Sequence, residues 1–83
     1  MPYTYILLCG DGTYYTGCAK DLETRLQQHE SGKGARYTRG RLPVKLVYCE
    51  HYKTLGEAMR RENKVKRWPR SKKQSLIESG RRR

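Results

Sequence analysis

The fold is decided by one stretch near the start of the chain, Tyr3-Thr4-Tyr5-Ile6-Leu7-Leu8-Cys9-Gly10-Asp11-Gly12-Thr13-Tyr14-Tyr15-Thr16-Gly17-Cys18. Residues 3–9 and 13–18 alternate in the manner of β-strands and are rich in β-forming side chains. The Gly-Asp-Gly sequence between them predicts a hairpin turn. The chain is therefore expected to begin with two antiparallel strands.

The register of this hairpin depends on the length of its loop, because a shift of one residue turns every side chain to the opposite face. Two-residue and three-residue loops both fit the sequence. We expect the three-residue loop, which pairs Leu7 with Tyr15 and Tyr5 with Gly17. Both tyrosines then lie on one face of the sheet, with open space over Gly17.

Downstream of the hairpin, the sequence predicts a helix and a third strand. Asp21 is a suitable N-cap for a helix over residues 22–31, which Gly32 ends. After a basic loop, residues 44–51 are dominated by β-branched and apolar side chains and predict a strand.

Two capping boxes predict two further helices. Thr54-Leu55-Gly56-Glu57 opens a helix that extends to about Lys66, and Ser71-Lys72-Lys73-Gln74 opens a short helix at 71–79 that Gly80 ends. Together these elements predict an α/β (α+β) fold, with a three-stranded antiparallel β-sheet flanked by helices.

The length and the charge point to one small domain with a polyanionic partner. Eighty-three residues leave room for one core, and we expect a single domain over 1–83, with its core at about 3–68 and a basic tail at 81–83. Nineteen Lys and Arg against eight Asp and Glu give a net charge of +11. Such a charge attracts nucleic acid, because each neutralised phosphate releases counterions. Ribosomal and acidic-membrane partners fit the same composition.

The compartment is expected to be the cytosol. No stretch approaches the roughly 18 apolar residues of a membrane span, and no signal peptide is recognised, so no membrane partner is expected. The cysteines Cys9, Cys18 and Cys49 lack the close pairing of a zinc site and are expected to be free thiols.

Two side chains of the first helix are candidates for a functional site. Leu22 and Leu26 define the buried stripe of that helix, and Arg25 and His29 fall beside the stripe. They are therefore expected to point along the sheet toward the tyrosines. A solvated helix edge is the alternative interpretation.

A carboxylate on the next helix is the third candidate. Its apolar stripe includes Ala58, Met59 and Val65, and Glu62 projects into the middle of it. A carboxylate at a buried position is costly unless it binds a cation or another strong partner. The alternative interpretation is an i,i+4 ion pair with Lys66.

The segment at 32–41 predicts a glycine-rich basic loop that could contact nucleic acid. Its cationic side chains suit phosphate contacts and its one aromatic ring suits base stacking. A solvated charge run is the alternative. The candidate nucleic-acid-binding residues are Lys33, Arg36, Tyr37, Arg39 and Arg41.

These residues together resemble the GIY-YIG nuclease superfamily, in particular its small stand-alone bacterial members. Tyr3-Thr4-Tyr5 and Tyr15-Thr16-Gly17 are similar to its two motifs, residues 22–29 to its arginine helix, and Glu62 to its metal-binding glutamate. Two departures are visible: Tyr3 replaces the first glycine, and Cys18 stands where the excision-repair branch has a lysine.

The resemblance implies a metal-dependent endonuclease that hydrolyses phosphodiester bonds in DNA rather than RNA. It implies that Tyr5 is the general base, that His29 takes its proton onward, and that Tyr15 orients the phosphate or the water. Arg25 would hold the scissile phosphate, and Glu62 would bind a single Mg²⁺ or Mn²⁺. A role in repair or recombination, with a protein partner for targeting, would follow.

Two other interpretations compete with this one. The tyrosines could fill the core in a chain that has no Phe. The whole domain could also be a basic nucleic-acid-binding module without catalysis, which would bind in a salt-dependent and metal-independent way.

Overall fold

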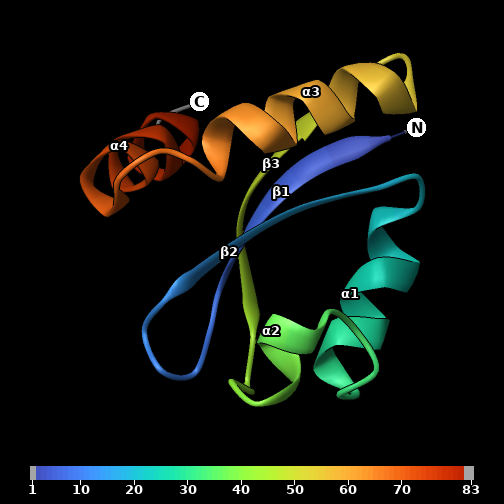
Figure 1. Cartoon of the computed structure of the whole chain (residues 1–83), viewed down its shortest axis with the longest axis vertical. Coiled ribbons are helices and arrows are strands. Elements are labelled where there is room, and N and C mark those ends of the chain that lie inside the picture. The colour runs from blue at the N-terminus through green and yellow to red at the C-terminus, as the bar shows by residue number, and fades with distance from the viewer. Residues whose placement is uncertain (1, 82–83) are drawn as a thin grey trace.

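A three-stranded antiparallel sheet forms the centre of the molecule, as the computed structural model shows for residues 2–81 (Figure 1). The strands are β1 (Tyr3–Leu8), β2 (Tyr14–Ala19) and β3 (Lys45–His51), in the spatial order β2-β1-β3. The predicted fold class is therefore confirmed. Arg82 and Arg83 of the expected basic tail lie outside the described residues.

The hairpin between β1 and β2 has the predicted register. Leu7 lies opposite Tyr15 and Tyr5 lies opposite Gly17. The Cys9 amide donates to the Thr13 carbonyl at 2.8 Å, so three residues form the loop. This odd loop length places the two tyrosines on the same face of the sheet.

Helices cover both faces of the sheet (Figure 1). Helices α1 (Leu22–Glu30) and α2 (Arg36–Arg39) lie on one side, and α3 (Leu55–Val65) and α4 (Arg70–Arg81) lie on the other. Because side chains alternate along β1, the chain has two small cores. One contains Tyr5, Leu7, Cys9 and Val44, and the other contains Ile6, Val65 and Ile77.

The first and third helices begin as their caps predict. The Asp21 carboxylate accepts a hydrogen bond from the Thr24 amide at the start of α1. At the start of α3, Thr54 and Glu57 form the reciprocal bonds of a capping box. These bonds satisfy amides that have no partner inside the helix. Within residues 2–81, no helix is long and apolar enough to cross a membrane.

Two expectations about local structure were wrong. The segment expected to be a loop contains the short helix α2, which starts at Arg36. The last helix spans Arg70–Arg81 rather than 71–79, and it begins where the Pro69 carbonyl accepts bonds from the Lys72 and Lys73 amides. Proline is tolerated there because the first turn needs no amide donor.

Gly80 lies inside α4 and does not end it. A Cβ atom at this position would lie 2.8 Å from two ring carbons of Tyr48. The glycine therefore allows α4 to pack closely on β3, which is a tertiary reason that the local sequence pattern does not reveal.

Candidate active site

The two motif tyrosines enclose Gly17. A Cβ atom on Gly17 would lie 2.7 Å from the Tyr5 hydroxyl and 2.9 Å from a ring carbon of Tyr15. The expectation of open space over Gly17 was wrong, because the end of the Tyr5 ring occupies it. The ring centroids of Tyr5 and Tyr15 are 6.4 Å apart. Glycine is needed here for the close approach of a side chain to the strand.

Buried hydrogen bonds fix the tautomer of His29. The Tyr5 hydroxyl lies 2.8 Å from His29 Nε2, and His29 Nδ1 lies 2.9 Å from Thr38 Oγ1. The Thr38 hydroxyl donates its single hydrogen to the Ala35 carbonyl, at 2.9 Å. Nδ1 must therefore carry the proton and donate to Thr38, so that Nε2 accepts from Tyr5.

The pKa values keep this arrangement at neutral pH. Burial, and then the Arg25 guanidinium, lower the pKa of His29 to about 4. Burial and the neighbouring Tyr15 raise the pKa of Tyr5 to about 12, although Arg25 opposes the change. Tyr5 is thus a protonated phenol that donates to a neutral imidazole. His29 is 0% exposed and Tyr5 is 1% exposed.

Arg25 belongs to α1, and its side chain interacts with both tyrosines. Its guanidinium Nη1 donates to Gln28 Oε1 at 2.9 Å. Burial raises the pKa of Tyr15 above its ordinary value, and the charge of Arg25 opposes this rise. A cation beside two phenols favours negative charge in the same place, whether that charge is a phenolate or a bound phosphate.

Glu62 reaches the same edge of the sheet from α3. Its side chain is 20% exposed, and its carboxylate lies 3.9 Å from Lys66 Nζ. Burial and the Glu62 carboxylate raise the pKa of the Cys18 thiol to about 11, which places the carboxylate beside β2. The apolar stripe is narrower than expected, since Met59 is 48% exposed. Glu62 therefore lies at the margin of the buried face.

A comparison with known proteins identifies the family of this chain. The model of the GIY-YIG catalytic domain matches residues 1–75 of this chain. The chain belongs to the GIY-YIG family.

Proteins of similar length match nearly the whole chain. The chain is 50% identical over 78 residues to a UPF0213 protein of Staphylococcus saprophyticus, covering 94% of this chain and 95% of the relative. It is 46% identical over 77 residues to a UPF0213 protein of Halobacterium salinarum, covering 93% and 100%. A solution NMR structure of a UPF0213 protein from Bacillus halodurans has a TM-score of 0.60 at 48% identity, covering 94% of this chain and 84% of that chain.

Within this GIY-YIG domain, the five predicted site residues come from four elements. Four of them interact directly or electrostatically on the α1 side of the sheet, namely Tyr5, Tyr15, Arg25 and His29. Glu62 approaches from the α3 side and affects Tyr15 through its charge. The two groups of residues meet at β2, which is an edge strand of the sheet.

The basic segment near α2 has partly structural contacts. Arg41 donates to Asp11 at 2.9 Å and to the Tyr37 carbonyl at 2.8 Å, and its guanidinium lies 3.9 Å from the centre of the Tyr37 ring. Tyr37 also stacks on Tyr15, with centroids 5.9 Å apart. Arg39 donates to the Gly34 carbonyl at 3.2 Å. Lys33 and Arg36, the other two cations of this segment, are exposed.

One residue of the hydrogen-bonded chain was not predicted. Thr38 is fully buried and holds His29 in its tautomer. It follows His29 by nine positions in a segment interpreted as a loop, so no helical spacing connects the two residues. A polar residue among glycines and arginines gives no local signal of burial.

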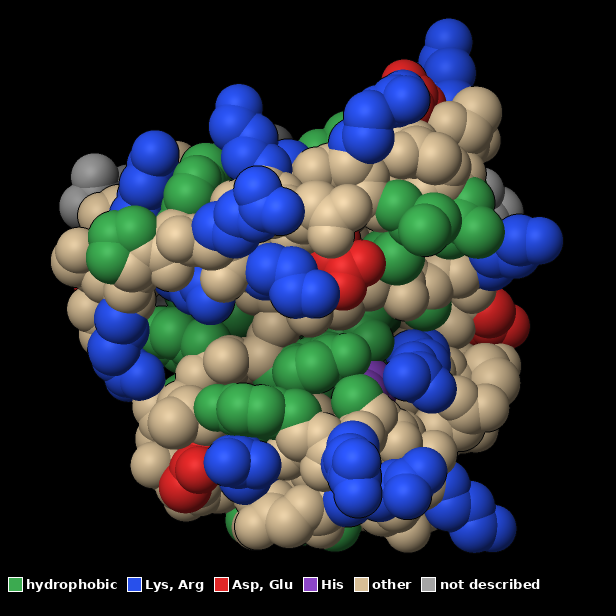
Figure 2. Space-filling view, viewed as in Figure 1, with side chains coloured by type: hydrophobic (Ala, Val, Ile, Leu, Met, Phe, Trp, Pro, Cys, Tyr) green, Lys and Arg blue, Asp and Glu red, His purple; other side chains and the backbone are tan. Residues whose placement is uncertain are grey.

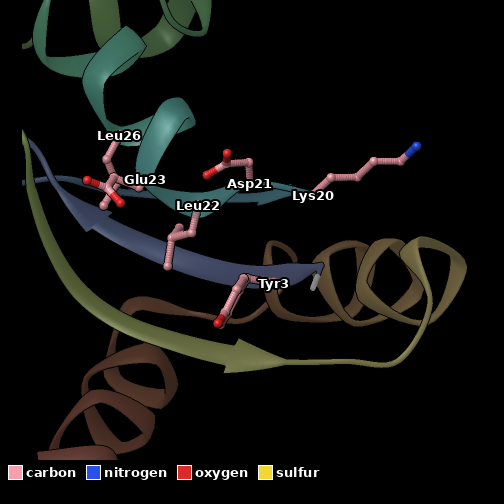
Figure 3. Close-up of a pocket in the computed structure, with 6 residues that line it drawn as sticks. All are labelled: Tyr3, Lys20, Asp21, Leu22, Glu23 and Leu26. Atoms are coloured by element: carbon pink, nitrogen blue, oxygen red, sulfur yellow. The ribbon is translucent and has the colours of Figure 1, made fainter.

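One pocket lies away from these residues (Figure 3). It has a volume of about 510 Å³ and lies between the start of β1 and the start of α1, where Tyr3, Leu22 and Leu26 line it together with three charged residues. Lys20 extends away from the other lining side chains. The pocket includes none of the five predicted site residues. The candidate active site therefore lies outside this pocket.

Proposed function

We propose that this protein is a metal-dependent endonuclease that hydrolyses phosphodiester bonds in DNA. GIY-YIG domains have a nuclease-type fold. The observation that carries the proposal is the oriented set Tyr5–His29–Thr38, with Arg25 and Glu62 beside it. A role in repair or recombination, and a protein partner for targeting, are parts of the same proposal.

The donor set at Glu62 fits one hard divalent ion. Within residues 2–81, no group of three or more His, Cys, Asp or Glu side chains could hold a metal. Mg²⁺ is commonly bound through one or two carboxylates, keeping several waters or substrate oxygens as its other ligands. Glu62 would hold Mg²⁺ or Mn²⁺ in this way. The ion supplies an acidified water and offsets negative charge on the phosphate.

Arg25 is proposed to bind the scissile phosphate. Its planar guanidinium suits phosphate oxygens in a forked contact. Tyr15 is partly exposed and lies 5.4 Å from His29, measured between the ring centroids. We assign it the orientation of the phosphate or the attacking water.

Tyr5 is proposed to take the proton of the attacking water as it passes its own proton to His29 Nε2. The direction of the hydrogen bond fits this transfer, because Nε2 is the acceptor. In the free protein the pKa values oppose it. A phosphate bound beside Arg25 offsets the charge that lowers the pKa of His29, which makes the imidazole a better acceptor.

The test is cleavage of plain, nicked and branched DNA with Mg²⁺ or Mn²⁺. Wild type is compared with Glu62→Ala and Arg25→Ala, purified in the same way and checked for folding by circular dichroism. The proposal expects metal-dependent products from the wild type and a loss of about 100-fold or more in each variant. Equal activity in all three proteins would exclude this active site. His51→Ala, a change at an exposed histidine of β3, is a matched control.

A non-catalytic nucleic-acid-binding module is the second candidate. The burial of Tyr5 and His29, at 1% and 0% exposure, favours it. For such a module we expect binding that depends on salt but not on metal or on Glu62→Ala. The binding should weaken when the charges of Arg36, Arg39 and Arg41 are removed. Metal-dependent turnover above a purified Glu62→Ala control would reject it.

A further inference from the structure

A long run of positive charge lies where α3 passes into α4. Residues 60–73 contain eight Lys or Arg and one acidic residue, Glu62. By comparison, the segment at 33–41 contains four Lys or Arg. Four side chains of the run are exposed near the junction of the two helices, and they are named here the α3–α4 bank: Lys66, Arg67, Arg70 and Lys72.

Two of the four side chains of the bank are fixed to the body of the protein. Arg70 Nη1 donates to the Gly12 carbonyl at 2.6 Å, and its guanidinium lies 4.4 Å from the centre of the Tyr14 ring. Lys72 Nζ lies 4.3 Å from the centre of the Trp68 ring, which packs on the core cluster of Ile6, Val65 and Ile77. These charges are held in place before any partner binds, which lowers the entropy lost on binding.

The bank borders the candidate active site. Lys66 is one helical turn from Glu62 and lies 3.9 Å from its carboxylate. Arg70 contacts Tyr14, which precedes Tyr15 in β2. Figure 2 shows Lys and Arg side chains on both sides of a band of hydrophobic side chains, over α3 and α4 above the band and over α1 and α2 below it. The two basic surfaces thus flank the same edge of the sheet.

The aromatic rings near the bank are already covered by cations. Arg61 and Lys72 lie over Trp68, and Arg70 lies over Tyr14. On the opposite side, Arg41 and Tyr15 contact Tyr37. Single-stranded nucleic acid binds through free aromatic faces on which bases stack. This surface instead offers cations for phosphate oxygens, so its chemistry suits a duplex with paired bases.

We propose that the α3–α4 bank binds the phosphate backbone of double-stranded nucleic acid across the candidate active site from the basic segment at 33–41. The inference rests on the proposed function, because it names the substrate form and a second contact surface for that site. A duplex carries one charge per roughly 1.7 Å of axis. The longest dimension of the molecule is 28 Å, so it faces many more phosphates than four cations can neutralise, and a second bank extends the contact.

The test measures binding in EDTA, where no metal-dependent cleavage occurs. Fluorescence anisotropy with a labelled 20-base-pair duplex and the matching single strand is recorded from 50 to 200 mM salt. The test variant is Lys66→Gln/Arg67→Gln/Lys72→Gln, which keeps Arg70 because that residue also holds the hairpin. The control is Lys20→Gln/Lys45→Gln/Lys53→Gln, which removes three exposed charges outside both basic surfaces.

The proposal expects the test variant to lose about three units from the slope of log affinity against log salt. The control should keep the wild-type slope within about one unit, and the duplex should bind more tightly than the single strand. Equal slopes in the two variants would reject the bank as a phosphate-binding surface. Tighter binding of the single strand would reject the duplex as the preferred form of nucleic acid. Failure of all cleavage assays, with the slopes as expected, would reject the nuclease proposal and leave the bank standing.

Discussion

Two carboxylates, one on β3 and one on α3, have almost the same exposure and very different partners. The Glu50 side chain is 18% exposed and the Glu62 side chain is 20% exposed. Glu50 accepts from the hydroxyls of Tyr48 and Tyr52, both at 2.6 Å, and from Arg61 at 2.9 and 3.1 Å. Within residues 2–81, the one ion pair of Glu62 is its 3.9 Å contact with Lys66.

This difference separates a structural carboxylate from one that can take a ligand. Burial raises the pKa of Glu50, but the bonds from Arg61, Tyr48 and Tyr52 together hold it below the ordinary value. The lone pairs of Glu50 are therefore occupied, whereas most of those on Glu62 are available to a cation. Arg61 precedes Glu62 in α3, so the forked contact with Glu50 also fixes the rotation of the helix that presents Glu62.

The largest expected effect is on the rate of cleavage, which should fall when Glu62 is changed but not when Glu50 is changed. Glu62→Gln keeps the size of the side chain and removes its charge, so we expect the rate of metal-dependent cleavage to fall about 100-fold or more. Glu50→Gln should remain within about tenfold of wild type. Single-turnover rates at a temperature where both variants are folded measure this. Equal losses in the two variants would break the comparison.

The next effect concerns His29. Both of its ring nitrogens have hydrogen-bond partners, as the carboxylate oxygens of Glu50 do. Its pKa is lowered from 6.5 to about 4 in the folded state. The unfolded chain therefore takes up a proton as the pH falls below about 6.5, and the folded protein does so only near 4. The stability that this group contributes is present above pH 6.5 and is lost as the pH falls from 6.5 to 4. We expect a loss of about 3 kcal/mol from this group. Urea unfolding between pH 7 and 4.5 measures it, and His29→Gln, which lacks the titrating group, should be less sensitive over the same range.

Removing Glu50 should cost stability. Glu50→Ala takes away the shared acceptor of two hydroxyls and a guanidinium in a half-buried place, and we expect a loss of about 2 kcal/mol in the free energy of unfolding. Chemical denaturation gives the value. A double-mutant cycle with Arg61→Ala should show coupling, and additive losses would show that the pair contributes little.

The smallest expected effect is the change in the free energy of unfolding when the contact between Glu62 and Lys66 is removed. Lys66 is 54% exposed and 3.9 Å from Glu62, and exposed ion pairs contribute little. Glu62→Gln and Lys66→Gln should each change the free energy of unfolding by less than about 0.5 kcal/mol. A loss as large as that of Glu50→Ala would mean that Glu62 is held in the structure as Glu50 is.

Local chemistry explains what could be predicted from the sequence. The register of the hairpin follows from loop length and alternation, and the starts of α1 and α3 follow from Asp21 and Thr54, since all of these depend on neighbours in the chain. Contacts between distant segments could not be predicted. No sequence pattern distinguishes Glu50 as the partner of Arg61, or shows that Gly80 packs against Tyr48.

The same limit applies to the candidate site. Helical periodicity directed Arg25 and His29 toward the tyrosines, and the hydrogen bond from Tyr5 to His29 agrees with that direction. The position of the proton on His29 depends on Thr38, which lies in the short helix α2, and on Ala35, the N-cap of that helix. This segment was expected to be a loop. Propensity alone does not predict so short a helix, because tertiary packing stabilises it.

The strand order β2-β1-β3 has a consequence for the solubility of the protein. It leaves β2 at one edge of the sheet, and the six residues of this strand carry no charge. An uncharged edge of β-forming residues is a template for pairing between molecules. The net charge of +11 keeps copies of the chain apart, and salt or a bound polyanion screens that repulsion. The charges proposed to hold a duplex therefore also protect the free protein from aggregation.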